Sequence, residues 1–128
     1  MKLDKVPIKT HKNLDVYIRS IEFVTLIYEV TKTFPKFELF NGIANQMRRA
    51  AVSIPSNIAE GAARQTNKEY TQFLYIASGS NSELEPQIQI AKNLKYIDDN
   101  LFNKLNKYQD DIGRMLVGLI KYRKSLNK

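Results

Sequence analysis

The stretch RRAAVSIPSNIAEG, residues 48–61, decides the fold because a helical core pattern runs through it without interruption, proline included. Pro55 removes one backbone N–H and disfavours helical angles at Ile54, so an isolated helix would break there. Apolar residues nevertheless recur at steps of three and four on both sides of Pro55, which is the spacing of one helix face. These residues are Phe40, Ala44, Met47, Ala51, Ile54 and Ile58. The pattern predicts one helix over about 37–60, kinked and not broken at the proline.

Three further helices follow from the same spacing. The first spans about 13–33 and ends before Pro35, and the last spans about 98–127. The apolar stripe of the last helix is Leu101, Leu105, Tyr108, Ile112, Met115, Leu119, Tyr122 and Leu126. Between the first and the last helix, a helix over about 66–95 begins with a capping box, in which Thr66 accepts from a free backbone N–H and Glu69 reaches back. The stripe of this helix is Tyr70, Leu74, Ala77, Asn81, Leu84, Ile88 and Ala91, of which Asn81 is the only strongly polar member. The connections are short, which favours antiparallel neighbours. The sequence therefore predicts a single domain over residues 1–128 that is all-α, an up-down-up-down four-helix bundle.

The helix over 13–33 differs from the others because it carries two apolar stripes on opposite sides. One stripe consists of Leu14, Tyr17, Ile18, Ile21, Val24 and Tyr28, and the other of Val16, Phe23, Ile27, Val30 and Phe34. One bundle core does not cover both stripes, and an exposed strip of large apolar side chains marks an interaction surface. We assign the second stripe, Val16 to Phe34, to an oligomer interface. The alternative is that the N-terminal segment folds back over it.

Positive charge is concentrated at the two ends of the chain. The net charge is +7, of which residues 1–12 carry +3 and residues 101–128 carry +5, while the rest sums to −1. An up-down-up-down topology brings both chain ends and the turn near residue 64 to the same end of the bundle. The residues that converge there, the basic pole, are Lys2, Lys5, Lys9, Lys12, Arg64, Lys68, Lys121, Arg123, Lys124 and Lys128. Such a surface is suited to the phosphate backbone of RNA or DNA.

Other chemistry has little support in the sequence. There is no cysteine and one histidine, so neither a disulfide framework nor a common zinc site is expected, and we expect no cofactor. No uncharged stretch approaches the length of a membrane span, so we expect a cytoplasmic protein without membrane contact. Arg49, Ser53, Ser56 and Glu60 form a polar row, but no His or Lys is placed to activate either serine. We expect no enzymatic activity; the row is either a solvated face or a polar seam or channel lining in an oligomer.

Two longer runs, QMRRAAVSIPSNIAEGAAR and YTQFLYIASGSNSELEPQIQIAKNLKYI, resemble a known family. It comprises bacterial four-helix bundle proteins associated with intervening sequences in large-subunit rRNA genes, often labelled ribosomal proteins. The resemblance extends over nearly the whole chain. It implies a homopentameric ring without known enzymatic activity. It also implies kinship to the accessory variability determinant of diversity-generating retroelements, a basic pentameric barrel that binds nucleic acid and a reverse transcriptase.

The positions that match the family motifs lie in the second and third helices. They are Arg48, Arg49, Ser53, Pro55, Ser56, Asn57, Glu60, Gly61, Gly79, Ser80, Glu83 and Glu85. We expect structural or assembly roles. Arg48 or Arg49 would pair with Glu60, Glu83 or Glu85, within or between subunits, and the small residues 77–80 would let two backbones approach closely. Pro86 departs from the family pattern and is expected to kink the third helix.

Three functional hypotheses follow, of which the first two have support in the sequence. The first is a non-enzymatic oligomer that binds nucleic acid through the basic pole. The second is a protein-interaction scaffold for a partner such as a reverse transcriptase, without direct contact to nucleic acid. A third, an enzyme that uses Glu60 with Ser53 or Ser56, lacks a base.

Overall fold

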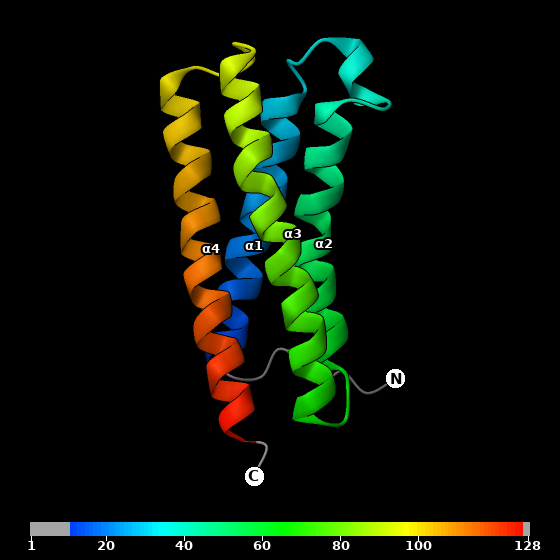
Figure 1. The fold of residues 1–128 in the computed structure, drawn as a ribbon, viewed down its shortest axis with the longest axis vertical. Coiled ribbons are helices and arrows are strands. Elements are labelled where there is room, and N and C mark those ends of the chain that lie inside the picture. The colour runs from blue at the N-terminus through cyan, green and yellow to red at the C-terminus, as the bar shows by residue number, and fades with distance from the viewer. Residues whose placement is uncertain (1–10, 127–128) are drawn as a thin grey trace.

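The protein is a bundle of four long helices (Figure 1). A computed structural model describes residues 11–126, with the side chains of residues 11 and 12 not described. The elements are α1 (His11–Thr31), the 3-10 helix η2 (Lys36–Leu39), α2 (Ile43–Ala62), α3 (Asn67–Asn93) and α4 (Asp99–Ser125). They run alternately up and down, and α1 and α3 each pack mainly against α2 and α4 (Figure 1). The all-helical, four-helix architecture expected from the sequence is confirmed.

None of the helices within residues 11–126 combines the length and the apolarity that a bilayer span requires.

Both helices that contain a proline continue through it. Pro55 lies inside α2 and is buried, and Pro86 lies inside α3 and is exposed. Next to Pro55, the Asn57 side-chain amide donates to the Ser53 carbonyl at 2.8 Å and contacts the Ser53 hydroxyl at 3.0 Å. The expectation that the second helix continues through Pro55 without a break is confirmed, while the kink at this residue stays a prediction.

The start of α2 differs from the expectation. Phe40, expected as its first core position, is 77 % exposed, and α2 begins only at Ile43. The residues just before Phe40 form the 3-10 helix η2, in which Glu38 is buried. The Glu38 carboxylate accepts hydrogen bonds from the Ile43 backbone N–H at 2.9 Å and from the Tyr96 hydroxyl at 2.6 Å. This carboxylate caps α2 and ties the connection between α1 and α2 to the connection between α3 and α4. The hydrogen bond to Glu38 also raises the pKa of Tyr96 above its ordinary value.

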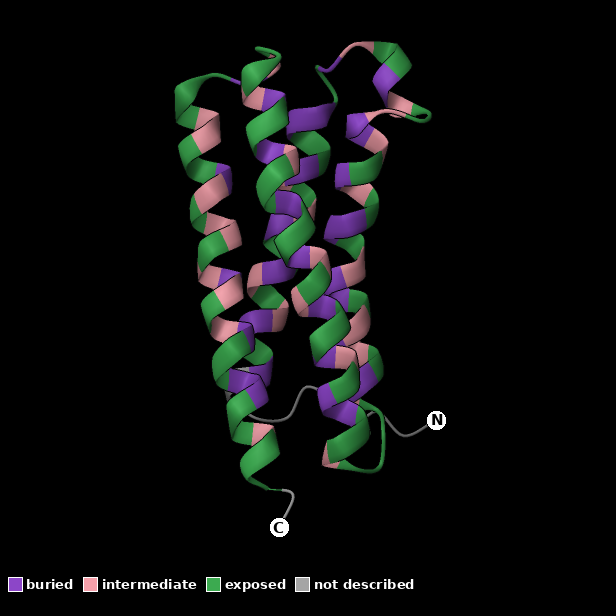
Figure 2. Cartoon of the chain, viewed as in Figure 1, coloured by how far each residue is buried: buried purple, intermediate pink, exposed green. Residues whose placement is uncertain are grey.

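The core contains the predicted stripe of α3 and most of the predicted stripes of α2 and α4. In α4, Leu105, Ile112 and Leu119 are buried, but Tyr122 and Leu126, which were expected in the stripe, are exposed. In α3 every predicted core position is buried: Tyr70, Leu74, Ala77, Asn81, Leu84, Ile88 and Ala91. Asn81 donates to the Gln109 carbonyl at 2.9 Å, and Gln109 donates to the Asn81 carbonyl at 3.2 Å, so the polar member of the stripe joins α3 to α4. Buried residues of the four helices face the inside of the bundle (Figure 2).

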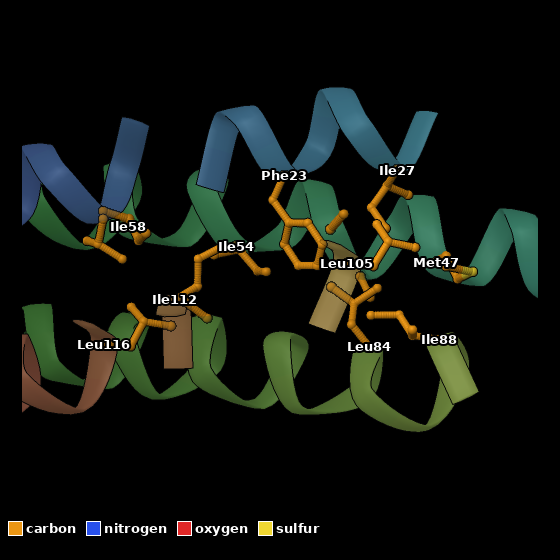
Figure 3. Packing of buried hydrophobic residues seen from close by; sticks show 14 of the residues in the cluster. Phe23, Ile27, Met47, Ile54, Ile58, Leu84, Ile88, Leu105, Ile112 and Leu116 are labelled. Atoms are coloured by element: carbon orange, nitrogen blue, oxygen red, sulfur yellow. The ribbon is translucent and has the colours of Figure 1, made fainter. Parts of the chain in front are cut away.

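The assignment of the two α1 stripes was wrong. Val16, Phe23, Ile27, Val30 and Phe34, expected at an oligomer interface, are 0–6 % exposed and form the α1 part of the core. Phe23 and Ile27 point into the bundle toward Leu105 (Figure 3), and the Phe23 ring stacks on Tyr108 with centroids 5.6 Å apart. This stripe continues beyond the helix, because Phe34 packs on Tyr96 with ring centroids 4.9 Å apart.

The opposite stripe of α1 is the more exposed one, although two of its six residues, Tyr17 and Val24, are partly buried against the core. Leu14, Ile18, Ile21 and Tyr28 are 40–47 % exposed in the single chain. We call these four residues the outer stripe. The argument that one core does not cover both stripes therefore holds, with the inner and outer roles exchanged.

Candidate nucleic-acid interface

The start of α1, the turn between α2 and α3, and the end of α4 lie at the same end of the bundle (Figure 1). The described cations of the basic pole come from two of these segments: Arg64 and Lys68 from the turn and the first turn of α3, and Lys121, Arg123 and Lys124 from the end of α4. Lys2, Lys5, Lys9 and Lys128 lie outside the described residues, as does the side chain of Lys12. The topology thus brings together the described part of the predicted cluster.

Arg123 links α4 to the first turns of α3. One terminal nitrogen of its guanidinium donates to the Asn67 side-chain oxygen at 3.0 Å, and the group lies 4.6 Å from the centre of the Tyr70 ring. The Nε of Arg123 is buried and has no hydrogen-bond partner among the described residues. Arg123 is therefore a structural member of the basic pole, held in place by α3.

Arg64 is less available to a ligand than the sequence indicated. It forms an ion pair with Glu60, one turn earlier, at 2.6 Å, and its guanidinium lies 4.7 Å from the centre of the Phe73 ring. Glu60 offsets the charge of Arg64, and both side chains are too exposed for the pair to add much stability. Lys68 and Lys121 are exposed, so most of the free positive charge in the described part of the pole belongs to lysines.

Lys124 makes a third contact with an aromatic residue of α3. Its ammonium group donates to the Tyr75 hydroxyl at 3.2 Å and lies 5.8 Å from the centre of the Tyr75 ring. Tyr70, Phe73 and Tyr75 therefore each meet a cation from a neighbouring segment. Sequence reasoning had used Tyr70 only as a core residue and had given Phe73 and Tyr75 no role at the pole. The sequence did contain a signal for this role, because three aromatic residues lie within the first turns of α3, next to the cations of the basic pole.

The hydroxyl of Tyr70 is buried and has no hydrogen-bond partner among the described residues, which leads to a testable prediction. Replacing Tyr70 by Phe removes an unsatisfied donor, so the free energy of unfolding at neutral pH is expected to stay equal or to rise by about 1 kcal/mol. Urea unfolding followed by circular dichroism measures it. A clear loss of stability would show that the hydroxyl has a partner.

The same substitution shows how much Tyr70 contributes to the dependence of folding stability on pH. Burial raises the pKa of Tyr70 from 10.0 to about 12, against the opposing effect of Arg123. The folded chain then keeps this proton to higher pH than the unfolded chain. The resulting contribution to stability is complete below pH 10 and is lost as the pH rises to about 12. Tyr70→Phe is therefore expected to lose less stability than the wild type between these two pH values.

The motif residues of α2 and α3 have mainly packing roles. The hydroxyls of Ser53 and Ser80 are 2.7 Å apart and join the two helices. Gly61 lies against α3, since a Cβ there would approach Phe73 Cβ to 2.7 Å and Tyr70 Cδ1 to 2.8 Å. Gly79 has no such neighbour within 4 Å, so the close backbone approach expected at residues 77–80 does not occur at this glycine.

Within the single chain, Arg48 contacts α1 and not one of the expected glutamates, while pairing of the motif arginines between subunits stays a prediction. Arg48 donates through Nε to the Thr31 hydroxyl at 2.8 Å and lies over the Tyr28 ring at 4.5 Å, so it joins α2 to α1. Glu60 pairs with Arg64 instead. Arg49 and Glu83 both line an open groove between α2 and α3. Ser56 and Glu85 are exposed.

The comparisons with known proteins agree with this architecture. Residues 12–118 match the family described as 23S rRNA-intervening sequence protein. A crystal structure of a protein of unknown function from the S23 ribosomal protein family of Bacteroides thetaiotaomicron VPI-5482 has the same fold. It superposes with a TM-score of 0.77 at 23 % identity, covering 86 % of this chain and 98 % of that one. No curated protein matches the chain. Because the family match covers most of its length, the chain belongs to the 23S rRNA-intervening sequence protein family.

Proposed function

We propose that this protein is a non-enzymatic homo-oligomer, assembled as a homopentameric ring, that binds the phosphate backbone of nucleic acid through its basic pole. The observation that carries the proposal is that the exposed Lys68, Lys121 and Lys124 come from two segments, the start of α3 and the end of α4, that lie at the same end of the bundle and are joined there by Arg123. When lysines bind phosphates, the counterions condensed on the nucleic acid are released into solution. The affinity therefore falls steeply as the salt concentration rises. The family description refers to 23S rRNA, which makes RNA the first nucleic acid to test.

The outer stripe supports the oligomer. Burying a large apolar side chain contributes about 1.5–3 kcal/mol, and the four residues of this stripe remain half exposed in a single chain. A contact between this stripe and a different surface of the next copy would generate a ring if the rotation closes. Ring symmetry would then repeat the basic pole around one rim and increase the number of phosphates in reach.

Charge reversal at the pole tests nucleic-acid binding. In the triple variant Lys68→Glu, Lys121→Glu and Lys124→Glu, the affinity for a structured RNA is expected to fall by about ten-fold or more at low salt. The slope of log affinity against log salt is expected to fall by about one for each lost phosphate contact. Fluorescence anisotropy across a salt series measures both quantities, with a DNA hairpin in parallel.

The matched control changes the net charge equally but near the other end of the bundle. It is Lys32→Glu, Lys36→Glu and Lys104→Glu, all exposed lysines. The control is expected to bind far better than the pole variant. No binding by the wild type at low salt, or an equal loss in both variants, would contradict a binding site at the pole.

The protein-interaction scaffold is the second candidate, and the outer stripe is the observation that favours it. Its partner would be a polypeptide such as a reverse transcriptase. Pull-down from native extract with nuclease treatment separates the two candidates. A partner that resists nuclease and is lost with Ile18→Asp favours the scaffold.

A further inference from the structure

We propose that the nucleic acid bound at the basic pole is single-stranded, and that one of its bases stacks on Tyr75 while Lys124 holds an adjacent phosphate. This inference rests on the proposed function and names the class of ligand. It is carried by the arrangement of cations and rings around the first turns of α3.

The three aromatic residues of this segment differ in exposure. Tyr70 is 4 % exposed beneath Arg123, and Phe73 is half-buried beside Arg64. Tyr75, in contrast, is 51 % exposed beside Lys124. Tyr70 and Phe73 are used in packing the bundle, so Tyr75 offers ring surface that the described residues leave in contact with water.

The contact with Lys124 also orients the Tyr75 ring. The ammonium group donates to the hydroxyl at 3.2 Å, which ties the end of the side chain to α4. An exposed ring that is held in one orientation loses less conformational freedom when a base stacks on it. Lys124 retains donors for a phosphate oxygen, because a lysine ammonium has three.

A ring beside a lysine distinguishes single strands from duplexes. A duplex keeps its bases stacked on each other and presents mainly its phosphates to a protein. Lysines such as Lys68 and Lys121 bind phosphates without the help of an aromatic residue. A single strand offers free base faces, and aromatic side chains within a basic surface bind these faces with little sequence preference. An exposed tyrosine on this surface therefore favours a single-stranded ligand.

The test compares Tyr75→Leu with Tyr75→Phe. Oligonucleotides of about 16 nucleotides, single-stranded or as a duplex with the same number of phosphates, serve as probes in anisotropy measurements. The wild type is expected to bind the single strand more tightly. Tyr75→Leu is expected to weaken single-strand binding by about ten-fold and to leave duplex binding unchanged. Tyr75→Phe keeps the ring and is expected to retain most of the single-strand affinity.

Phe102→Leu is the matched control, because Lys92 lies 4.1 Å from the centre of that ring at the opposite end of the bundle. It is expected to bind as the wild type does. Equal affinities for the two probes, or single-strand binding that is unaffected by Tyr75→Leu, overturn the inference and leave the proposed function standing. Absence of binding to both probes at low salt overturns the proposed function and this inference with it.

Discussion

Phe23→Asp is expected to unfold the chain and not merely to dissociate an oligomer. Phe23 is fully buried and stacks almost parallel on Tyr108, at an interplanar angle of 7°. Truncating a buried Phe costs about 3–5 kcal/mol, and an unpaired carboxylate in the same place adds its desolvation. Since whole domains have a stability of about 5–15 kcal/mol, this one change removes most or all of it.

Circular dichroism and thermal melting measure the effect. Phe23→Leu is the control, because it keeps an apolar side chain in the core and is expected to remain folded with a lower melting temperature. A folded Phe23→Asp protein with a melting temperature close to that of the wild type would show that this side chain does not lie in the core.

Ile18→Asp combined with Ile21→Asp is expected to do the reverse: the chain stays folded and the assembly dissociates. The two side chains are 47 % and 41 % exposed, so the aspartates remain hydrated in a single chain. In a subunit contact the same two carboxylates would be buried without partners, which opposes association strongly. Sedimentation velocity is expected to shift from an oligomer to a species of 14.8 kDa, the mass of one chain.

The control places two aspartates on the exposed face of α4, Asn103→Asp and Val117→Asp. This variant is expected to sediment as the wild type does. A monomeric wild type, or an oligomer that survives both changes in α1, would contradict an interface at the outer stripe.

Much of the fold could be predicted because its signals are local. Apolar spacing located the four helices and the core positions of α3, and the Thr66 hydroxyl accepts from the Glu69 backbone N–H at 3.1 Å as the capping box indicates. The in-phase pattern around Pro55 correctly favoured a continuous helix. The position of the described cations at one end of the bundle followed from topology alone. Short connections make successive helices antiparallel, and this places the turn between α2 and α3 and the end of α4 at the same end.

Some of the expectations that failed depend on contacts between residues far apart in the sequence. Glu38 and Tyr96 are 58 residues apart, and nothing in the local pattern shows that the carboxylate caps α2. The ion pair of Arg64 with Glu60, in contrast, is local: the two residues are one helical turn apart, a spacing that favours such a pair, and the expectation that Glu60 pairs with Arg48 or Arg49 overlooked it.

The α1 stripes show the limit most clearly. Helical periodicity established that this helix has two apolar faces and that one of them stays outside the core. Periodicity did not show which of the two faces is buried, because both are built from similar side chains. Burial depends on which face meets a complementary surface of the other helices. Tertiary packing made the choice: Phe23 fits against Tyr108 of α4, and Phe34 extends the same face onto Tyr96 beyond the helix end. On the other face, Leu14, Ile18, Ile21 and Tyr28 remain 40–47 % exposed in the single chain.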